Sequence, residues 1–337
     1  MNAVLLGLIL GGIFGAAARA GRFCLLRGMK GAMGQGDLAP LRAFALALAV
    51  AICATQALAW QGLTDLSATL PMRGAASWPG MFAGGAIFGL GMVLANACGA
   101  RSVVLAAGGN MRSVLVLMAL GLSAQASMTG VLAPLRGWFQ SLGQARPATT
   151  LPDLLAGMGQ GPALALSVGL PALLLAAFAL PLLRQNRLDA ACAAVIGLVV
   201  AAGWWATFAT DDPFDPRILT SISFVGPVGD GLLWLMLSTG RALSFGIAVV
   251  AGTALGALAA ALLMRDLRLE GFGSGAQMQR ALAGGVLMGF GGVLALGCSI
   301  GQGLSGVSTL SLASLVAFSG ILAGIAVALV LFRNRTS

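Results

Sequence analysis

The chain has 337 residues, of which 58% are hydrophobic and 9% are charged. A soluble domain of this length cannot bury so many apolar side chains in one core, so the composition excludes a soluble globular protein and indicates an integral membrane protein. In such a protein the net charge of +9 reflects basic cytoplasmic loops, and we expect no nucleic-acid partner.

Nine apolar segments are long enough to cross a bilayer as helices. In chain order they cover residues 3–20, 42–62, 80–98, 112–132, 163–183, 190–208, 242–263, 280–298 and 310–332. Residues 99–111 are too short to span, and both 99–111 and 21–41 are too rich in glycine. Both are nevertheless too apolar for ordinary loops, so we expect short re-entrant helices there. The sequence therefore predicts an all-α integral membrane protein with about nine transmembrane helices.

Charged residues alternate between the loops as nine spans require. Basic residues dominate 21–42, 99–112, 184–189 and the region after 263, whereas 209–240 carries four aspartates and one arginine. By the positive-inside rule, we expect the N-terminus outside and the C-terminus in the cytoplasm.

One string of 15 residues occurs twice, 200 positions apart. Residues 84–98 and 284–298 share eight identical residues without a gap, and each string ends in a cysteine, Cys98 or Cys298. A match of this extent far exceeds chance, so the chain contains an internal duplication. Both copies keep a thiol at the end of a glycine-rich apolar helix.

The duplication predicts the division of the chain. We expect residues 1–135 to form a first repeat with four spans, 136–189 a linker that holds the fifth span, and 190–337 a second repeat with the last four spans. A single linking span inverts the second repeat relative to the first. Inverted repeats place the substrate site near the membrane midplane, at the interface between the repeats.

Glycines and small polar residues follow both repeated cysteines, at 99–102 and 299–306. Glycine lets the backbone turn, and a helix that starts after such a turn presents N–H groups to an anion. No carboxylate accompanies either segment and the chain has no histidine. The sequence therefore favours an anion site, and we expect neither a cofactor nor a metal ion.

A third cysteine, Cys24, lies among Arg19, Arg22 and Arg27 just after the first span. Positive charge attracts anions and activates thiols, although an ordinary interfacial thiol has the same setting. The corresponding segment of the second half, about 220–227, has small polar residues and no cysteine. The remaining cysteines, Cys53 and Cys192, lie within spans among alanine and valine, where a thiol packs as a small hydrophobic group.

Three parts of the sequence carry a resemblance. They are Arg-Phe-Cys at 22–24, Leu-Ala-Asn-Ala-Cys-Gly-Ala-Arg at 94–101 with Gly-Gly-Asn at 108–110, and Gly-Cys-Ser-Ile-Gly-Gln-Gly-Leu-Ser-Gly at 297–306. Together they resemble the signature motifs of the YeeE/YedE family of sulfur-transport membrane proteins, over nearly the whole chain. The resemblance implies a transporter, not an enzyme, that imports an inorganic sulfur anion, best represented by thiosulfate, across the bacterial cytoplasmic (inner) membrane.

The resemblance also implies roles for individual residues. The two repeats would surround a central constriction, where Cys24, Cys98 and Cys298 would pass the anion on through transient S–H···S contacts. Further positions that would line the path are Arg22, Asn96, Arg101, Gly109, Asn110, Ser299, Gln302 and Ser305. Ala97 departs from the glycine expected before the middle cysteine and would narrow the constriction. Besides the lipid bilayer, the implied partner is a small cytosolic TusA-like sulfur carrier.

Three alternatives stay open on the sequence alone. A membrane sulfurtransferase or thiol redox enzyme would form a persulfide on one of the cysteines, although it lacks a histidine or in-span carboxylate as general base. An anion channel would use the cysteines only for packing. A transporter of another sulfur or selenium compound would share the same site.

Overall fold

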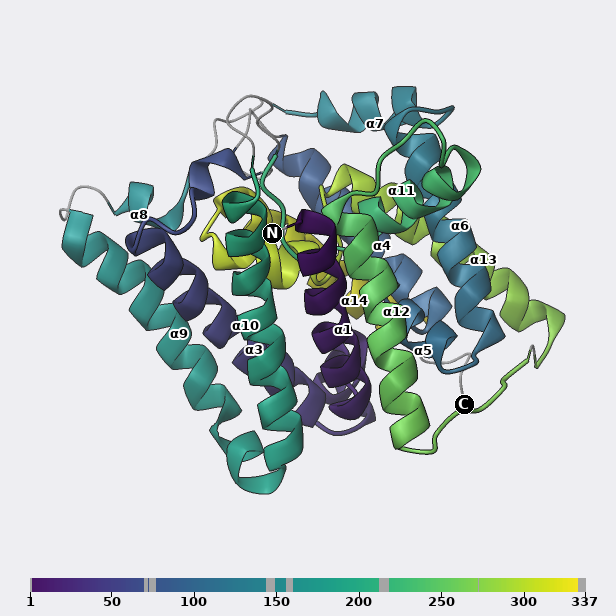
Figure 1. Cartoon of the computed structure of the whole chain (residues 1–337), viewed down its shortest axis with the longest axis horizontal. Coiled ribbons are helices and arrows are strands. Elements are labelled where there is room, and N and C mark those ends of the chain that lie inside the picture. The colour runs from purple at the N-terminus through teal and green to yellow at the C-terminus, as the bar shows by residue number, and fades with distance from the viewer. Residues whose placement is uncertain are drawn as a thin grey trace.

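The computed structural model describes residues 2–69, 72, 77–143, 149–155, 160–211, 218–271 and 273–332. These residues form a bundle of helices joined by short connections (Figure 1). The predicted all-α class is confirmed. The charged residues of the orientation argument at 73, 212, 215, 217, 333 and 335 lie outside the described residues.

Nine of the described helices have 18 residues or more. They are α1 (Ala3–Ala20), α3 (Ala39–Trp60), α4 (Trp78–Ala95), α6 (Met111–Met128), α9 (Gln160–Gln185), α10 (Arg187–Ala209), α12 (Phe245–Leu263), α13 (Gly275–Leu294) and α14 (Leu312–Phe332). Each corresponds to one predicted span. Among the described residues, eight of these helices are both long and apolar enough to cross a membrane, and α13 is the exception. It begins with Gln277, Gln279 and Arg280 and is rich in glycine, which lowers its mean hydropathy.

Shorter elements connect the long helices. They are α2 (Leu25–Lys30), α5 (Gly99–Ala107), α7 (Ala133–Gln140), α8 (Leu151–Leu154) and α11 (Val225–Met236), the 3-10 turn η2 (Leu66–Ala68), and the π-helical turns η1 (Gly31–Gln35) and η5 (Gly301–Gly306). The expected short helices after the first and third spans are thus α2 and α5. The expected repeat boundaries at 135 and 189 fall within α7 and α10.

Glycine sets the closest helix contacts. In α1, Gly11 and Gly15 lie so near the backbone of α12 that a Cβ atom on either would overlap the carbonyl oxygen of Val249 or Thr253. Gly256 of α12 meets the backbone of α1 in the same way. Small residues at four-residue spacing allow this close approach. The hydrophobic effect does not drive helices together within lipid, so close packing must stabilise the contact.

The contact between α4 and α13 is reciprocal. A Cβ atom on Gly84 would lie 2.7 Å from the Ala295 nitrogen, and one on Gly284 would lie 2.6 Å from the Ala95 nitrogen. The start of each repeated string therefore packs on the end of the other, so the two helices run antiparallel. The same contact is made twice, at an offset of 200 residues.

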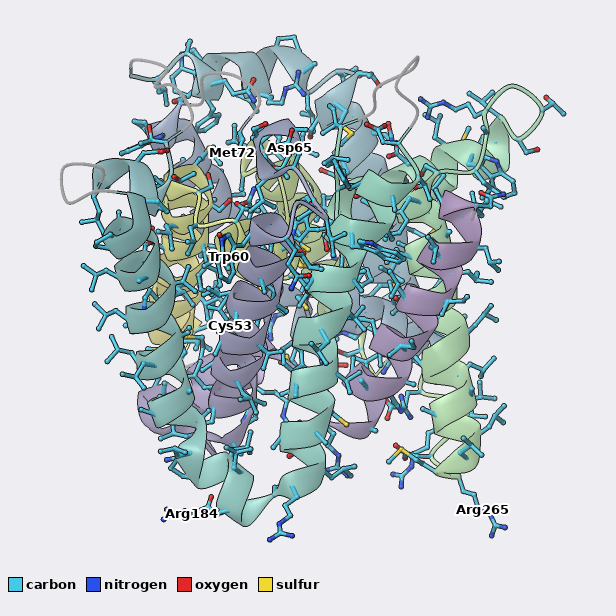
Figure 2. The ribbon with its side chains drawn as sticks, turned by 60° about the vertical axis from the view of Figure 1, so that its left-hand side comes forward. Cys53, Trp60, Asp65, Met72, Arg184 and Arg265 are labelled. Atoms are coloured by element: carbon cyan, nitrogen blue, oxygen red, sulfur yellow. The ribbon has the colours of Figure 1, made fainter. Side chains whose placement is uncertain are left out.

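Labelled side chains distinguish the two ends of the bundle in Figure 2. Trp60 and Asp65 lie at one end, whereas Arg184 and Arg265 lie at the other (Figure 2). We call these the tryptophan end, where α1 and α4 start, and the arginine end, where α1 and α12 finish. Helix α1 begins at the tryptophan end and reaches the arginine end at Arg19.

Candidate functional site

A tight turn holds the first repeated cysteine between α4 and α5. Helix α4 ends at Asn96, whose φ of 57° is left-handed and stops the helix. Cys98 is the N-cap of α5, and its Sγ accepts a hydrogen bond from the Arg101 backbone N–H at 3.4 Å. A sulfur atom here takes the place of the serine or asparagine oxygen that usually caps a helix.

The same turn recurs after α13. Leu296 has a φ of 58°, and the Sγ atom of Cys298 accepts a hydrogen bond from the Gly301 backbone N–H at 3.3 Å. A left-handed leucine is strained, since its Cβ crowds the backbone. Both turns therefore hold a thiol at the start of a short helical segment, and the positions again differ by 200.

Asn96 has a second function, because its Oδ1 accepts a hydrogen bond from Lys30 Nζ at 2.8 Å. Two substitutions distinguish the contribution of the left-handed turn at Asn96 from that of its hydrogen bond with Lys30. Asn96→Gly fits a φ of 57° and should leave the melting temperature of the purified protein nearly unchanged, although it loses the lysine partner. Asn96→Val should destabilise the fold by about 1–3 kcal/mol, because a β-branched residue is strained in this region. Equal melting temperatures for the two variants would contradict the assigned role of the turn.

The three cysteines of the predicted path lie together in the interior. Cys24, Cys98 and Cys298 are 2%, 4% and 0% exposed, and Cys98 lies within electrostatic range of both other thiols. The hydroxyl of Ser299, which is 1% exposed, lies beside the Cys98 thiol and makes no hydrogen bond of standard geometry among the described residues. The Ser299 hydroxyl therefore belongs to the same buried cluster as the thiols.

One cavity opens toward this cluster from the arginine end. It has a volume of about 330 Å³, and Cys24, Cys98 and Ser299 form part of its wall. Its charged lining residues are Arg19, Arg22, Arg27, Arg101, Asp266, Arg268 and Glu270. Among the described residues, these give the cavity a net formal charge of +3, which favours an anion.

The described cavity wall contains two acidic residues, although the sequence motifs around the cysteines contain none. Asp266 and Glu270 reach the cavity from the connection between α12 and α13. Asp266 forms ion pairs with Arg19 and Arg268, and Glu270 accepts a hydrogen bond from Asn110 Nδ2. The prediction of a site without acidic groups is therefore wrong at the cavity wall, because the fold brings in residues far away in the chain.

A second cavity lies at the tryptophan end. It has a volume of about 610 Å³, and its wall includes Ser223, Gln302 and Ser305. The charged described residues that line it are Arg136, Asp211 and Asp230. The large excess of arginine is thus confined to the other cavity.

Three consecutive residues, 297–299, join the walls of the two cavities. Gly297 lines the cavity at the tryptophan end and Ser299 lines the cavity at the arginine end. Cys298 lies between them and is fully buried. Cys298 is therefore buried between a residue of one cavity wall and a residue of the other.

The structure sorts the further predicted positions into two groups. Arg22, Arg101, Asn110 and Ser299 line the cavity at the arginine end, and Gln302 and Ser305 line the cavity at the tryptophan end. Asn96 and Gly109 line neither cavity among the residues that the structure describes.

Several of these residues also have a structural role. The Asn110 side chain caps α6 by accepting a hydrogen bond from the Ser113 N–H at 3.0 Å. Ser305 donates to the Ile222 carbonyl oxygen at 2.8 Å. Gln302 donates to the Ala295 carbonyl oxygen at 2.8 Å, while its Oε1 is buried and has no partner among the described residues. Gly109 has a φ of 96°, which requires glycine.

The other cysteines and Ala97 line neither of the two cavities. Cys53 is exposed on the outer face of α3 (Figure 2), and Cys192 packs against Gly21. Ala97 is buried, and the described cavity walls do not include it. The described side chains include no group of three or more His, Cys, Asp or Glu residues that could hold a metal ion.

Apolar helices long enough to cross a bilayer define a multi-pass membrane protein, and its two cavities lie on either side of the buried Cys298. Residues 20–327 match the model of the sulphur transport family, and the chain belongs to that family. It is 27% identical to the thiosulfate transporter TsuA of Escherichia coli (strain K12), over 89% of this chain and 86% of that protein. It is 28% identical to the thiosulfate transporter TsuA of Spirochaeta thermophila, over 97% of this chain and 99% of that protein. The resemblance to the YeeE/YedE sulfur transporters is thereby confirmed.

Proposed function

We propose that the chain imports thiosulfate across the bacterial cytoplasmic membrane and passes the anion between its two cavities along Cys24, Cys98 and Cys298. The observation that carries the proposal is the position of Cys298, which is buried between a residue of one cavity wall and a residue of the other. The names of both relatives support thiosulfate as the substrate.

The architecture that we propose has two inverted repeats, at 1–135 and 190–337, with 136–189 as the linker. The antiparallel contact of α4 with α13 and the recurrence of the cysteine turn at an offset of 200 support it. The concentration of arginine at one end supports a cytoplasmic position for that end, with the N-terminus outside.

Neutral thiols suit a soft, divalent anion. In the proposed mechanism the arginines concentrate thiosulfate in their cavity, while the thiols and the Ser299 hydroxyl offer weak hydrogen bonds at the constriction. A fixed positive charge at the constriction would hold the dianion too tightly for release, and a thiolate would repel it. Transient S–H···S contacts therefore permit passage without a covalent intermediate.

Import of a dianion works against the membrane potential. The cost is about 2.3 kcal/mol per charge per 100 mV, hence roughly 4–5 kcal/mol for thiosulfate. Consumption of the anion in the cytosol offsets this cost, and a TusA-like carrier that removes its sulfur is the partner that we propose for this step.

Growth on thiosulfate tests the proposed function. A sulfur-auxotrophic bacterium that lacks its own thiosulfate uptake should grow on thiosulfate when it expresses this chain and should not grow with an empty vector. Parallel cultures on sulfite, which the same strain can use, control for viability. No growth on thiosulfate by cells that contain the chain in their membrane and grow on sulfite would overturn the substrate assignment.

A further inference from the structure

Arg19 lines the cavity at the arginine end, and its guanidinium is already bound to an acidic residue. Its Nη2 donates to Asp266 Oδ2 at 3.1 Å and to the Asp266 backbone carbonyl oxygen at 2.6 Å. The Arg19 side chain is 12% exposed and that of Asp266 is 49% exposed. The arginine is thus held in the wall while the carboxylate faces open space.

The fold makes room for this guanidinium. A Cβ atom on Gly108 would overlap Arg19 Nη1, so the absence of a side chain at Gly108 lets the arginine lie across the end of α5. Cys24 and Cys98 line the same cavity. An anion beside these thiols therefore shares a small volume with Arg19.

Asp266 belongs to a segment, residues 265–271, that we call the strap. Three backbone hydrogen bonds tie the strap to 108–111: Arg268 N–H to Gly108 O at 3.3 Å, Glu270 N–H to Gly109 O at 3.2 Å, and Met111 N–H to Glu270 O at 3.0 Å. The approach is close enough that a Cβ atom on Gly109 would lie 2.7 Å from the Arg268 carbonyl oxygen. These bonds fix the place of Asp266 opposite Arg19.

We propose that Asp266 is an internal competitor for the transported anion: Arg19 is a substrate-binding residue that the Asp266 carboxylate occupies when no anion is bound. This inference rests on the proposed function and adds to it a residue that sets the affinity. A carboxylate and a sulfur oxyanion use the same guanidinium donors, so binding of one displaces the other. The half-exposed carboxylate can turn toward water when the oxyanion arrives and return when it leaves, which lowers the affinity and aids release.

Anion binding to the purified protein tests the inference without any need for transport. Melting temperatures are measured against rising concentrations of thiosulfate, and of sulfate as a second probe, for the unaltered chain and for Asp266→Asn. The substitution keeps the size and the backbone bond to Arg19 but removes the competing charge. We expect half-saturation at an anion concentration roughly three- to tenfold lower in Asp266→Asn, the range for a partly buried ion pair.

Two matched variants make the test specific. Glu270→Gln removes the other carboxylate of the cavity wall, which binds Asn110 and not Arg19, so its half-saturation should shift clearly less than that of Asp266→Asn. In the double variant Arg19→Gln/Asp266→Asn the gain in affinity should vanish. If Asp266→Asn does not fold, Asp266→Ser takes its place, because it also removes the charge. Unchanged or weaker binding in the charge-free variant, or no saturable shift in any protein, would overturn the inference.

Measurements of thiosulfate uptake distinguish failure of this inference from failure of the proposed function. In cells that accumulate thiosulfate, Asp266→Asn should lower both KM and the maximal rate, because tighter binding slows release. A merely structural role would lower abundance and leave KM alone. If the binding gain appears while no variant transports thiosulfate, the proposed function fails and the competitor role stands. If transport occurs and KM is unchanged, the competitor role alone fails.

Discussion

Replacing Cys98 by serine is expected to reduce thiosulfate uptake by about one to two orders of magnitude, while the protein still folds. Serine is a preferred N-cap residue, so its hydroxyl can accept the hydrogen bond that Cys98 Sγ now accepts from the Arg101 N–H. The substitution therefore preserves the start of α5 and removes only the sulfur. A hydroxyl is smaller and binds water more strongly than a thiol, so it offers a soft anion a poorer contact.

The measurement is the initial rate of labelled thiosulfate uptake, normalised to the amount of protein in the membrane. Cys298→Ser should show a comparable loss, since this residue is buried between a residue of one cavity wall and a residue of the other. Cys53→Ser is the matched control, because Cys53 is exposed on the outside of α3. Uptake by Cys98→Ser at the rate of the unaltered chain would show that the thiols only pack.

The second large effect is expected at the contact between α1 and α12. In Gly256→Val the new Cβ atom would overlap the Gly12 carbonyl oxygen. Backbone cannot rotate away as a side chain can, so the helices must separate, at a cost of about 3 kcal/mol or more. We expect most of this variant to aggregate on size-exclusion chromatography, and any folded fraction to melt at a clearly lower temperature.

Gly169→Val in α9 is the control for that experiment. It makes the same chemical change within a helix, but nothing lies within 4 Å of the position that its Cβ would take. It should elute and melt like the unaltered chain. A Gly256→Val protein that behaves like this control would contradict the packing of α1 on α12.

The sequence was sufficient to place the long helices. Each predicted span corresponds to one helix within a few residues, as with 242–263 against α12 (Phe245–Leu263). Apolar length is a local property, and lipid leaves few other structures possible. The exception is the predicted span 280–298. The corresponding helix, α13, has a polar start and many glycines, so its mean hydropathy is lower than that of the other spans.

The sequence could predict the residues of the candidate site only where a motif occurs twice or where the residues are neighbours in the sequence. Cys98 and Cys298 stand out because the same string occurs twice, and the structure places them in the same kind of turn. By contrast, Arg19 and Asp266 are 247 residues apart in the sequence, and no local pattern signals their contact. Gly109, which was expected on the path, lines neither cavity, whereas Asn110 lines the cavity at the arginine end and also caps α6.

The most direct test of the central claim, passage of an intact anion along the thiols, uses proteoliposomes and thiosulfate whose two sulfur atoms carry different isotopes. Transport predicts that both isotopes reach the lumen in equal amounts as thiosulfate, and that the masses of peptides with Cys24, Cys98 and Cys298 do not change. The contradicting result is a persulfide: one peptide gains a sulfur atom from the outer position of thiosulfate, and sulfite is released. The S–S bond of thiosulfate would then be cleaved by a cysteine, and the chain would be a sulfurtransferase.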